Sequence, residues 1–139
     1  MSDISMATVN GIHYKTGEPI RVELKDGRIG SITRLDNKAA GPLPKIGPGL
    51  VDLQINGGNG EDMNTLPLQQ DAVVRMVKSQ QRIGVTACYP TVITNSPEAI
   101  AEAVSAIAAA CDNNPGIAAT AKGIHLEGPF ISPQDGARG

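Results

Sequence analysis

The most constraining feature of this sequence is a regular alternation of apolar, strand-like segments with helix-like segments after residue 50. We expect strands at residues 50–55, 85–89 and 121–126, and helices at residues 71–83 and from about Pro97 to Asn113. Strands that alternate with helices over short connections form parallel sheets from βαβ units. The sequence therefore predicts an α/β fold for this part of the chain.

The beginning of the chain has a different pattern and predicts a small β unit. Alternating apolar and charged residues from Ile20 to Lys25 run into Asp26-Gly27, a pair that is typical of two-residue hairpin turns. Asn10-Gly11 predicts a second turn of the same chemistry.

A boundary between two parts of the chain is expected near residue 47. Residues 41–49 contain three prolines and three glycines, which favour neither helix nor strand. We therefore expect one part at residues 1–47 and a second part at residues 48–139.

Composition argues against several classes of function. Lys and Arg total 12 against 14 Asp and Glu, for a net charge of −2, and no basic stretch could neutralise successive phosphates, so no nucleic-acid partner is expected. No apolar run approaches the roughly 20 residues that cross a bilayer, and the sequence lacks a signal-peptide pattern. These patterns favour a cytoplasmic protein without a membrane partner. Cys88 and Cys111 are expected as free, buried thiols.

Polar residues follow each predicted strand of the second part. Gln54 and Asn56 end the first strand, Thr91 follows the second, and His125 and Glu127 end the third. The carboxyl ends of parallel strands meet at one edge, where ligands bind. A carboxylate such as Glu127 suits a divalent cation, the alternative being an exposed loop acid. For His125 we favour a packed, hydrogen-bonded histidine over a ligand or a partner of a ligand.

Other candidate motifs are weak. The glycine-rich residues 56–60 lack the lysine and hydroxyl residue that end a phosphate-binding loop, so we interpret them as a flexible turn. No Gly-x-Ser-x-Gly elbow occurs, and His13 is expected at the surface, so a serine nucleophile is disfavoured.

Three segments, taken in order, closely resemble the opening of the N-acetylglucosamine-6-phosphate deacetylases, a branch of the amidohydrolase superfamily. They are residues 48–57, residues 84–91, and the specific run from His125 to Phe130, His-Leu-Glu-Gly-Pro-Phe. The resemblance implies the start of a (β/α)8 barrel, with about three β/α units in residues 48–139, preceded by a β-sandwich segment in residues 1–47. It also implies a truncated chain, inactive and prone to aggregate through its unpaired sheet edge.

The resemblance also implies the site. One divalent metal ion is expected, Zn²⁺ first and Fe²⁺, Co²⁺ or Mn²⁺ as alternatives, with Glu127 as a direct ligand and Gln54 reaching it through a water. Gln54 and Asn56 stand where other superfamily members carry a His-x-His pair. Asn56, Thr91 and His125 would support the ligands. The catalytic Asp and two further histidine ligands would lie beyond Gly139, so no catalytic residue is expected within this chain.

The implied reaction is hydrolysis of the acetamide of N-acetylglucosamine 6-phosphate to glucosamine 6-phosphate and acetate, a step of amino-sugar catabolism carried out by a homodimer. Two alternatives remain. One is another amidohydrolase, such as an N-acetylgalactosamine-6-phosphate deacetylase or an N-acyl amino acid deacylase. The other is a non-catalytic α/β module that binds a ligand or a partner.

Overall fold

The computed structural model describes residues 6–36 and 42–128. Contacts divide the chain into two compact units, Met1–Pro48 and Gly49–Gly139, and each unit is described by itself. Pro129 and Phe130, which end the third family-like segment, lie outside the described residues.

The first unit is a four-stranded sheet. Its strands are β1 (Met6–His13), β2 (Pro19–Lys25), β3 (Arg28–Arg34) and β4 (Lys45–Ile46), in the order β3-β2-β1-β4. β1, β2 and β3 are antiparallel neighbours, and β4 runs parallel to β1. Asp26 and Gly27 have φ angles of 52° and 73°, which confirms the predicted hairpin turn. His13, expected at the surface, is half-buried, and its Nδ1 lies 3.0 Å from the Thr16 hydroxyl.

Two predictions for this unit are wrong. Asn10 and Gly11 make no turn but lie inside β1, because this strand pairs along its whole length with β2. At Gly11 a side chain would come within 2.4 Å of Ile46, so the glycine serves a close approach of β4. The proline-rich segment does contribute a short strand, since Pro44 and Ile46 accept hydrogen bonds from the backbone N–H groups of residues 12 and 14.

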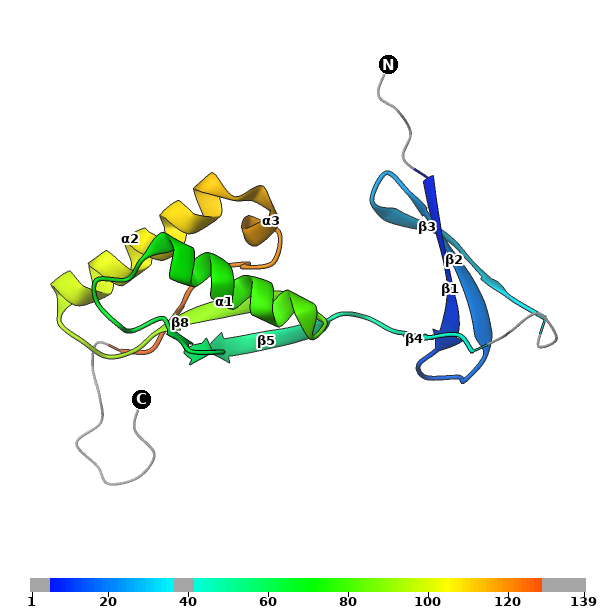
Figure 1. Cartoon of the computed structure of the whole chain (residues 1–139), viewed down its shortest axis with the longest axis horizontal. Coiled ribbons are helices and arrows are strands. Elements are labelled where there is room, and N and C mark those ends of the chain that lie inside the picture. Colours follow the sequence, from blue (N-terminus) through cyan, green and yellow to red (C-terminus); the bar gives the residue numbers. More distant parts are fainter. Residues whose placement is uncertain (1–5, 37–41, 129–139) are drawn as a thin grey trace, which may run out of the picture. The chain divides into compact units, whose positions relative to one another are not determined.

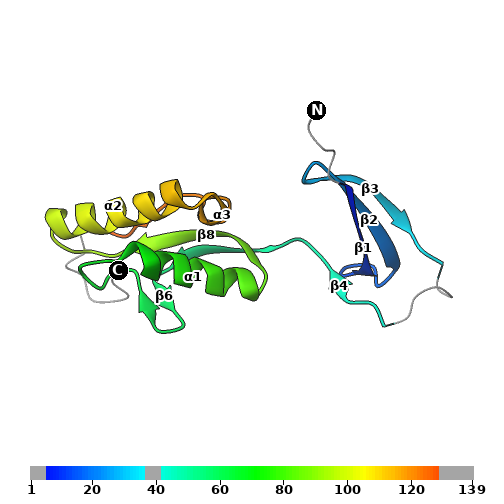
Figure 2. The ribbon, with the colours of Figure 1, turned by 45° about the horizontal axis from the view of Figure 1, so that its top comes forward.

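The second unit is a parallel three-stranded sheet with two main helices, which confirms the α/β class. Its larger elements are β5 (Leu50–Ile55), α1 (Gln70–Arg82), β8 (Val85–Val92), α2 (Pro97–Asn113), α3 (Pro115–Ala118) and β9 (His125–Leu126). β8 lies between β5 and β9, and both neighbours are parallel to it. Figures 1 and 2 show α1 and α2 side by side over the same face of this sheet.

Local signals explain where the helices begin and end. Gly84, with a φ of 92°, follows α1 and takes a left-handed conformation that a side chain would disfavour. Ser96 caps α2 by accepting a hydrogen bond of 3.2 Å from the backbone N–H of Ala99, and Pro97 occupies the first turn. The buried core joins both helices to the sheet and consists of Ile55, Met63, Leu68, Val73, Met76, Val77, Val85, Cys88, Val92, Ala103, Ile107, Ala110 and Ile117. No helix among the described residues is both long and apolar enough to span a bilayer.

Three details of this unit differ from expectation. The predicted strand at 121–126 reduces to a single bridge from Ala121 to Cys88 and the two residues of β9. The glycine-rich segment at 56–60 is part of a small hairpin of β6 (Gly57–Gly58) and β7 (Glu61–Asp62), not only a flexible turn. The mostly apolar run at residues 50–55 predicts a buried strand, yet Leu53 of β5 is 69% exposed, because the strand has β8 as its one neighbour among the described residues.

Candidate functional site

The carboxyl ends of β5 and β9 bring Gln54 and Glu127 together. The Gln54 side chain donates a hydrogen bond from Nε2 to Oε2 of Glu127, at 3.0 Å. Gln54 is exposed and Glu127 is half-buried. An ionised carboxylate only accepts hydrogen bonds, so the contact orients the amide with its nitrogen toward Glu127. The amide oxygen of Gln54 is then left to accept from another group.

The backbone of Glu127 is held on both sides of its Cα. Its N–H donates to the carbonyl of Val92 at 2.8 Å, and its own carbonyl accepts from the hydroxyl of Thr94 at 3.0 Å. The next residue, Gly128, has a φ of 118°. Sequence reasoning did not single out Thr94. The glycine directly after the acid was the local signal for an unusual backbone conformation here.

Thr91 and His125 are neighbours in the sheet, and neither takes part in the hydrogen bond between Gln54 and Glu127. They face each other in the parallel register of β8 and β9. Thr91 is fully buried, and its hydroxyl donates to the carbonyl of Tyr89 at 3.1 Å. His125 is half-buried, and its Nδ1 is buried without a hydrogen-bond partner among the described residues. The packed, hydrogen-bonded role that we favour for His125 stays a prediction.

Asn56 anchors the loop after β5. Its backbone carbonyl accepts a hydrogen bond of 2.8 Å from Met63, and its side chain is exposed. The structure describes no hydrogen bond between Asn56 and Glu127. Of the two residues at the His-x-His positions, Gln54 is therefore the one that reaches the acid.

Asn64 pins the same loop to the end of β8, a role that sequence reasoning missed. Its Nδ2 donates to the carbonyl of Thr91 at 3.2 Å, and its Oδ1 accepts from the N–H of Ile93 at 2.9 Å. The amide thus pairs with the strand as a neighbouring strand would. Asp62 holds the turn by accepting from the Asn64 N–H at 2.9 Å, and this Asp-x-Asn spacing was the available signal.

The donors present suit part of a metal site. Within residues 6–36 and 42–128, no three His, Cys, Asp or Glu side chains lie close enough together to hold a metal ion. Glu127 offers one carboxylate on a constrained backbone, and Gln54 offers an amide oxygen beside it. A carboxylate and an amide oxygen are donors of the kind that divalent cations take, and two such groups make up only part of a coordination shell.

Cys88 and Cys111 are free thiols, as expected, the first buried and the second half-buried. Burial raises the pKa of the Cys88 thiol to about 11, with a smaller contribution from Asp52. A thiol with a raised pKa is a poor nucleophile at neutral pH. Cys88 therefore acts as a core residue and not as a reactive group.

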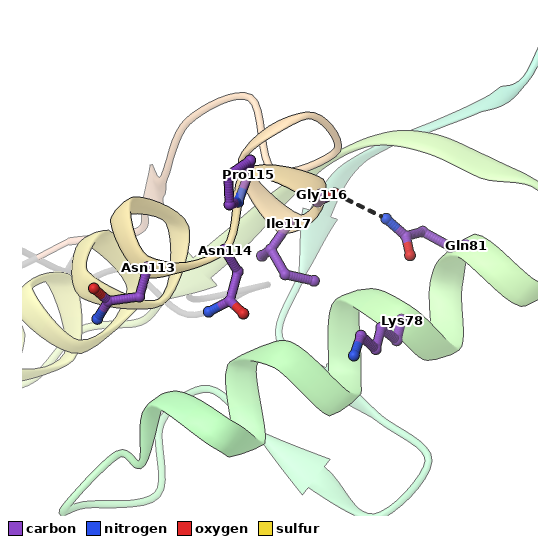
Figure 3. Close-up of a pocket in the computed structure, with 7 residues that line it drawn as sticks. All are labelled: Lys78, Gln81, Asn113, Asn114, Pro115, Gly116 and Ile117. Atoms are coloured by element: carbon purple, nitrogen blue, oxygen red, sulfur yellow. Dashed lines mark hydrogen bonds between the residues drawn. The ribbon is translucent and has the colours of Figure 1, made fainter.

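A hollow of about 310 Å³ lies on the helix side of the unit (Figure 3). Gln81 spans it, donating hydrogen bonds to the Gly116 carbonyl at 3.2 Å and to the Thr120 hydroxyl at 2.8 Å. The lining residues are Lys78, Gln81, Asn113, Asn114, Pro115, Gly116 and Ile117. None of the predicted site residues lines it, so the candidate site remains at the strand ends.

No family model matches the chain. Among curated proteins, it is 40% identical over 85 residues to the N-acetylgalactosamine-6-phosphate deacetylase of a Shewanella species, covering 60% of this chain and 20% of that protein. It is 38% identical over 91 residues to the N-acetylglucosamine-6-phosphate deacetylase of Caenorhabditis elegans, covering 63% and 21%. The enzyme of the same name from Bacillus subtilis is 28% identical over 143 aligned residues, covering 96% and 35%.

Solved structures share the fold. The N-acetylglucosamine-6-phosphate deacetylase of Pasteurella multocida superposes with a TM-score of 0.71 at 24% identity, covering 93% of this chain and 36% of that one. The Mycobacterium smegmatis enzyme gives a TM-score of 0.67 at 25% identity, covering 94% and 38%.

The matched curated proteins are named deacetylases, which hydrolyse an amide bond, so this chain is similar to part of an enzyme of that class. More narrowly, the chain is similar to the N-terminal part of N-acetylglucosamine-6-phosphate deacetylases, which confirms the resemblance seen in the sequence. It spans about a fifth of the length of the first curated relatives that it matches.

Proposed function

We propose that this chain forms the N-terminal part of a metal-dependent enzyme that hydrolyses N-acetylglucosamine 6-phosphate to glucosamine 6-phosphate and acetate. The observation that carries the proposal is the hydrogen bond between Gln54 and Glu127, which joins two of the segments that resemble the family. The names of the relatives support the substrate class, and one Mycobacterium smegmatis structure was solved in complex with N-acetyl-D-glucosamine-6-phosphate.

The architecture proposed for the whole enzyme is a (β/α)8 barrel with a small β-sandwich beside it. Residues 48–139 would supply the first three β/α units, and the exposed apolar side chains of β5 support the addition of further strands. Residues 1–47 would supply part of the sandwich. Ile29 and Ile32 of β3 are 64% and 58% exposed, which supports a second layer over this sheet.

In the proposed site, the Glu127 carboxylate would hold the metal ion. Gln54 hydrogen-bonds that carboxylate, and its free amide oxygen would accept from a water beside it. When bound, a divalent ion such as Zn²⁺ acidifies a water and polarises the acetamide carbonyl. His125 and Thr91 would pack beneath the ligands, and Asn56 would shape the adjoining loop. The groups that move protons would come from residues outside this chain.

A second substrate has its own support. The Shewanella relative is named an N-acetylgalactosamine-6-phosphate deacetylase and is 40% identical over the matched residues. The two substrates differ in the orientation of one hydroxyl group. Both sugar phosphates are therefore candidate substrates, and the assay separates them. We also propose that the whole enzyme is a homodimer in the cytoplasm.

The test uses the full gene product that contains this chain. Acetate release is measured from both sugar phosphates for the wild type, for Glu127→Gln, and for Glu102→Gln at an exposed position of α2 as the matched control. We expect Glu127→Gln to reduce release to background and Glu102→Gln to leave it unchanged. Faster release from N-acetylgalactosamine 6-phosphate would select the second substrate. Full activity of Glu127→Gln, or no release by the wild type from either compound, would overturn the proposal.

A further inference from the structure

We propose that Thr94 is a positioning residue for the metal ligand: its hydroxyl, seated against Gly128, holds the backbone of Glu127 so that the carboxylate points into the site. The inference rests on the proposed function of Glu127 and adds a residue to it. In this role Thr94 touches neither substrate nor metal. It acts through the peptide that follows the ligand.

The first observation is where the Thr94 hydrogen bond falls. β9 contains two residues and ends at Leu126, so the strand ladder holds Glu127 through its N–H, bonded to Val92 at 2.8 Å. The carbonyl of Glu127 has the Thr94 hydroxyl as its donor, at 3.0 Å. The side chain of Thr94, which follows β8, thus donates to the Glu127 carbonyl at the point where the backbone pairing of β9 with β8 has ended. Thr94 is half-buried, so water competes less for this bond than at an exposed position.

The second observation is the fit of Thr94 against Gly128. A Cβ at Gly128 would lie 2.4 Å from the Thr94 hydroxyl oxygen and 2.9 Å from its Cα. The φ of 118° at Gly128 is also a conformation that other residues rarely adopt. Because Gly128 has no side chain, the backbone can turn after Glu127 and Thr94 can pack directly against Gly128. A turn alone would require the φ value but not this contact.

These contacts matter because metal ligation tolerates little displacement. Ligand distances in metal sites hold to within about 0.2 Å of their ideal values, so a small shift of the Glu127 backbone weakens binding. Gln54 cannot supply this constraint alone, since its exposed side chain holds only the far end of the carboxylate. Thr94 constrains the other end of the same residue.

The test measures Zn²⁺ affinity of the full gene product by chelator competition. Thr94→Val removes the hydroxyl and keeps the shape, Thr94→Ser keeps the hydroxyl, and Thr86→Val at the opposite end of β8 is the control. We expect Thr94→Val to weaken Zn²⁺ binding by about ten- to a hundredfold, the range seen for partners of metal ligands. Thr94→Ser should stay within about threefold of the wild type, and Thr86→Val should match it.

A second background separates positioning from general destabilisation. In Glu127→Asp the carboxylate is already displaced, so Thr94→Val should weaken binding by a clearly smaller factor there than in the wild type. Equal factors in both backgrounds, or unchanged affinity of Thr94→Val, would overturn the inference. If Thr94→Val does not fold, Thr94→Ala is titrated in the same way. A wild type that binds no Zn²⁺ would refute the proposed function itself. If substitution of Glu127 weakens Zn²⁺ binding but substitution of Thr94 does not, only this inference is refuted.

Discussion

Gln54 and Glu127 form a side-chain hydrogen bond of 3.0 Å although 73 positions separate them in the chain. Gln54 lies in β5 and Glu127 directly follows β9, and these strands are not neighbours, because β8 lies between them in the sheet. The two side chains therefore meet across the carboxyl end of β8. This end is itself secured by Asn64 and Thr94, so the contact rests on three segments of the chain.

Replacing Gln54 by methionine tests the contact itself. Gln54→Met keeps the length of the side chain but removes the donor to Glu127 and the free amide oxygen. We expect Zn²⁺ affinity of the full gene product to fall by about tenfold or more, as for other partners of metal ligands. Gln70→Met, at an exposed position of α1, is the control. Equal affinities for Gln54→Met and the wild type would contradict the role of Gln54.

Asn64→Ala should loosen the end of β8. The variant loses both hydrogen bonds to the strand and leaves the Ile93 N–H and the Thr91 carbonyl without these partners. At about 1 kcal/mol for each bond, we expect a loss of about 2 kcal/mol in stability. Amide hydrogen exchange of the Ile93 N–H measures this loss of stability at the end of β8. Asn113→Ala, at the exposed end of α2, should change stability by less than about 0.5 kcal/mol. Unchanged protection of Ile93 would refute the pinning role.

Ser96→Ala tests the start of α2. The serine side chain accepts from the Ala99 N–H, and its loss should cost about 1 kcal/mol. Ser96→Asp keeps an acceptor at the same position and should restore most of that stability. The measurement is hydrogen exchange in the first turn of α2. If Ala and Asp variants exchange equally fast, the cap is not what stabilises this helix end.

The raised pKa of the Cys88 thiol predicts that the protein loses stability at alkaline pH. Its pKa is raised from 9.0 to about 11 in the folded protein, so between these values the unfolded chain loses its proton first. The folded state then binds more protons, and the free energy of unfolding falls as pH rises through this window. At about 1.4 kcal/mol per pKa unit, the fall amounts to about 2 to 3 kcal/mol.

Denaturation of the wild type and of Cys88→Ala between pH 8 and about 11 provides the measurement. The alanine variant will be less stable throughout, since it leaves space in the core. Its stability curve should nevertheless be flatter than that of the wild type over this pH range. Parallel curves would show that Cys88 does not cause the alkaline loss.

Much of the fold was predictable because its signals are local. The helix expected at residues 71–83 is observed at Gln70–Arg82, since apolar spacing marks its face and Gly84 marks its end. Pro97, the expected start of the second helix, is likewise the first residue of α2. The prediction at Asn10-Gly11 was wrong for the opposite reason. A turn-forming pair was overruled by its pairing with β2 and by the close approach of β4, which are non-local contacts.

The sequence by itself determined the order of the main strands and helices of the second unit, and it placed Gln54 and Glu127 at strand ends, because periodicity, caps and turn residues act over a few neighbouring positions. Only the tertiary structure decided that these two side chains touch while Thr91 bonds within its own strand, and that Asn64 and Thr94 secure the end of β8. Contacts of this kind depend on the register between strands and on the path of loops, and no short stretch of sequence contains either.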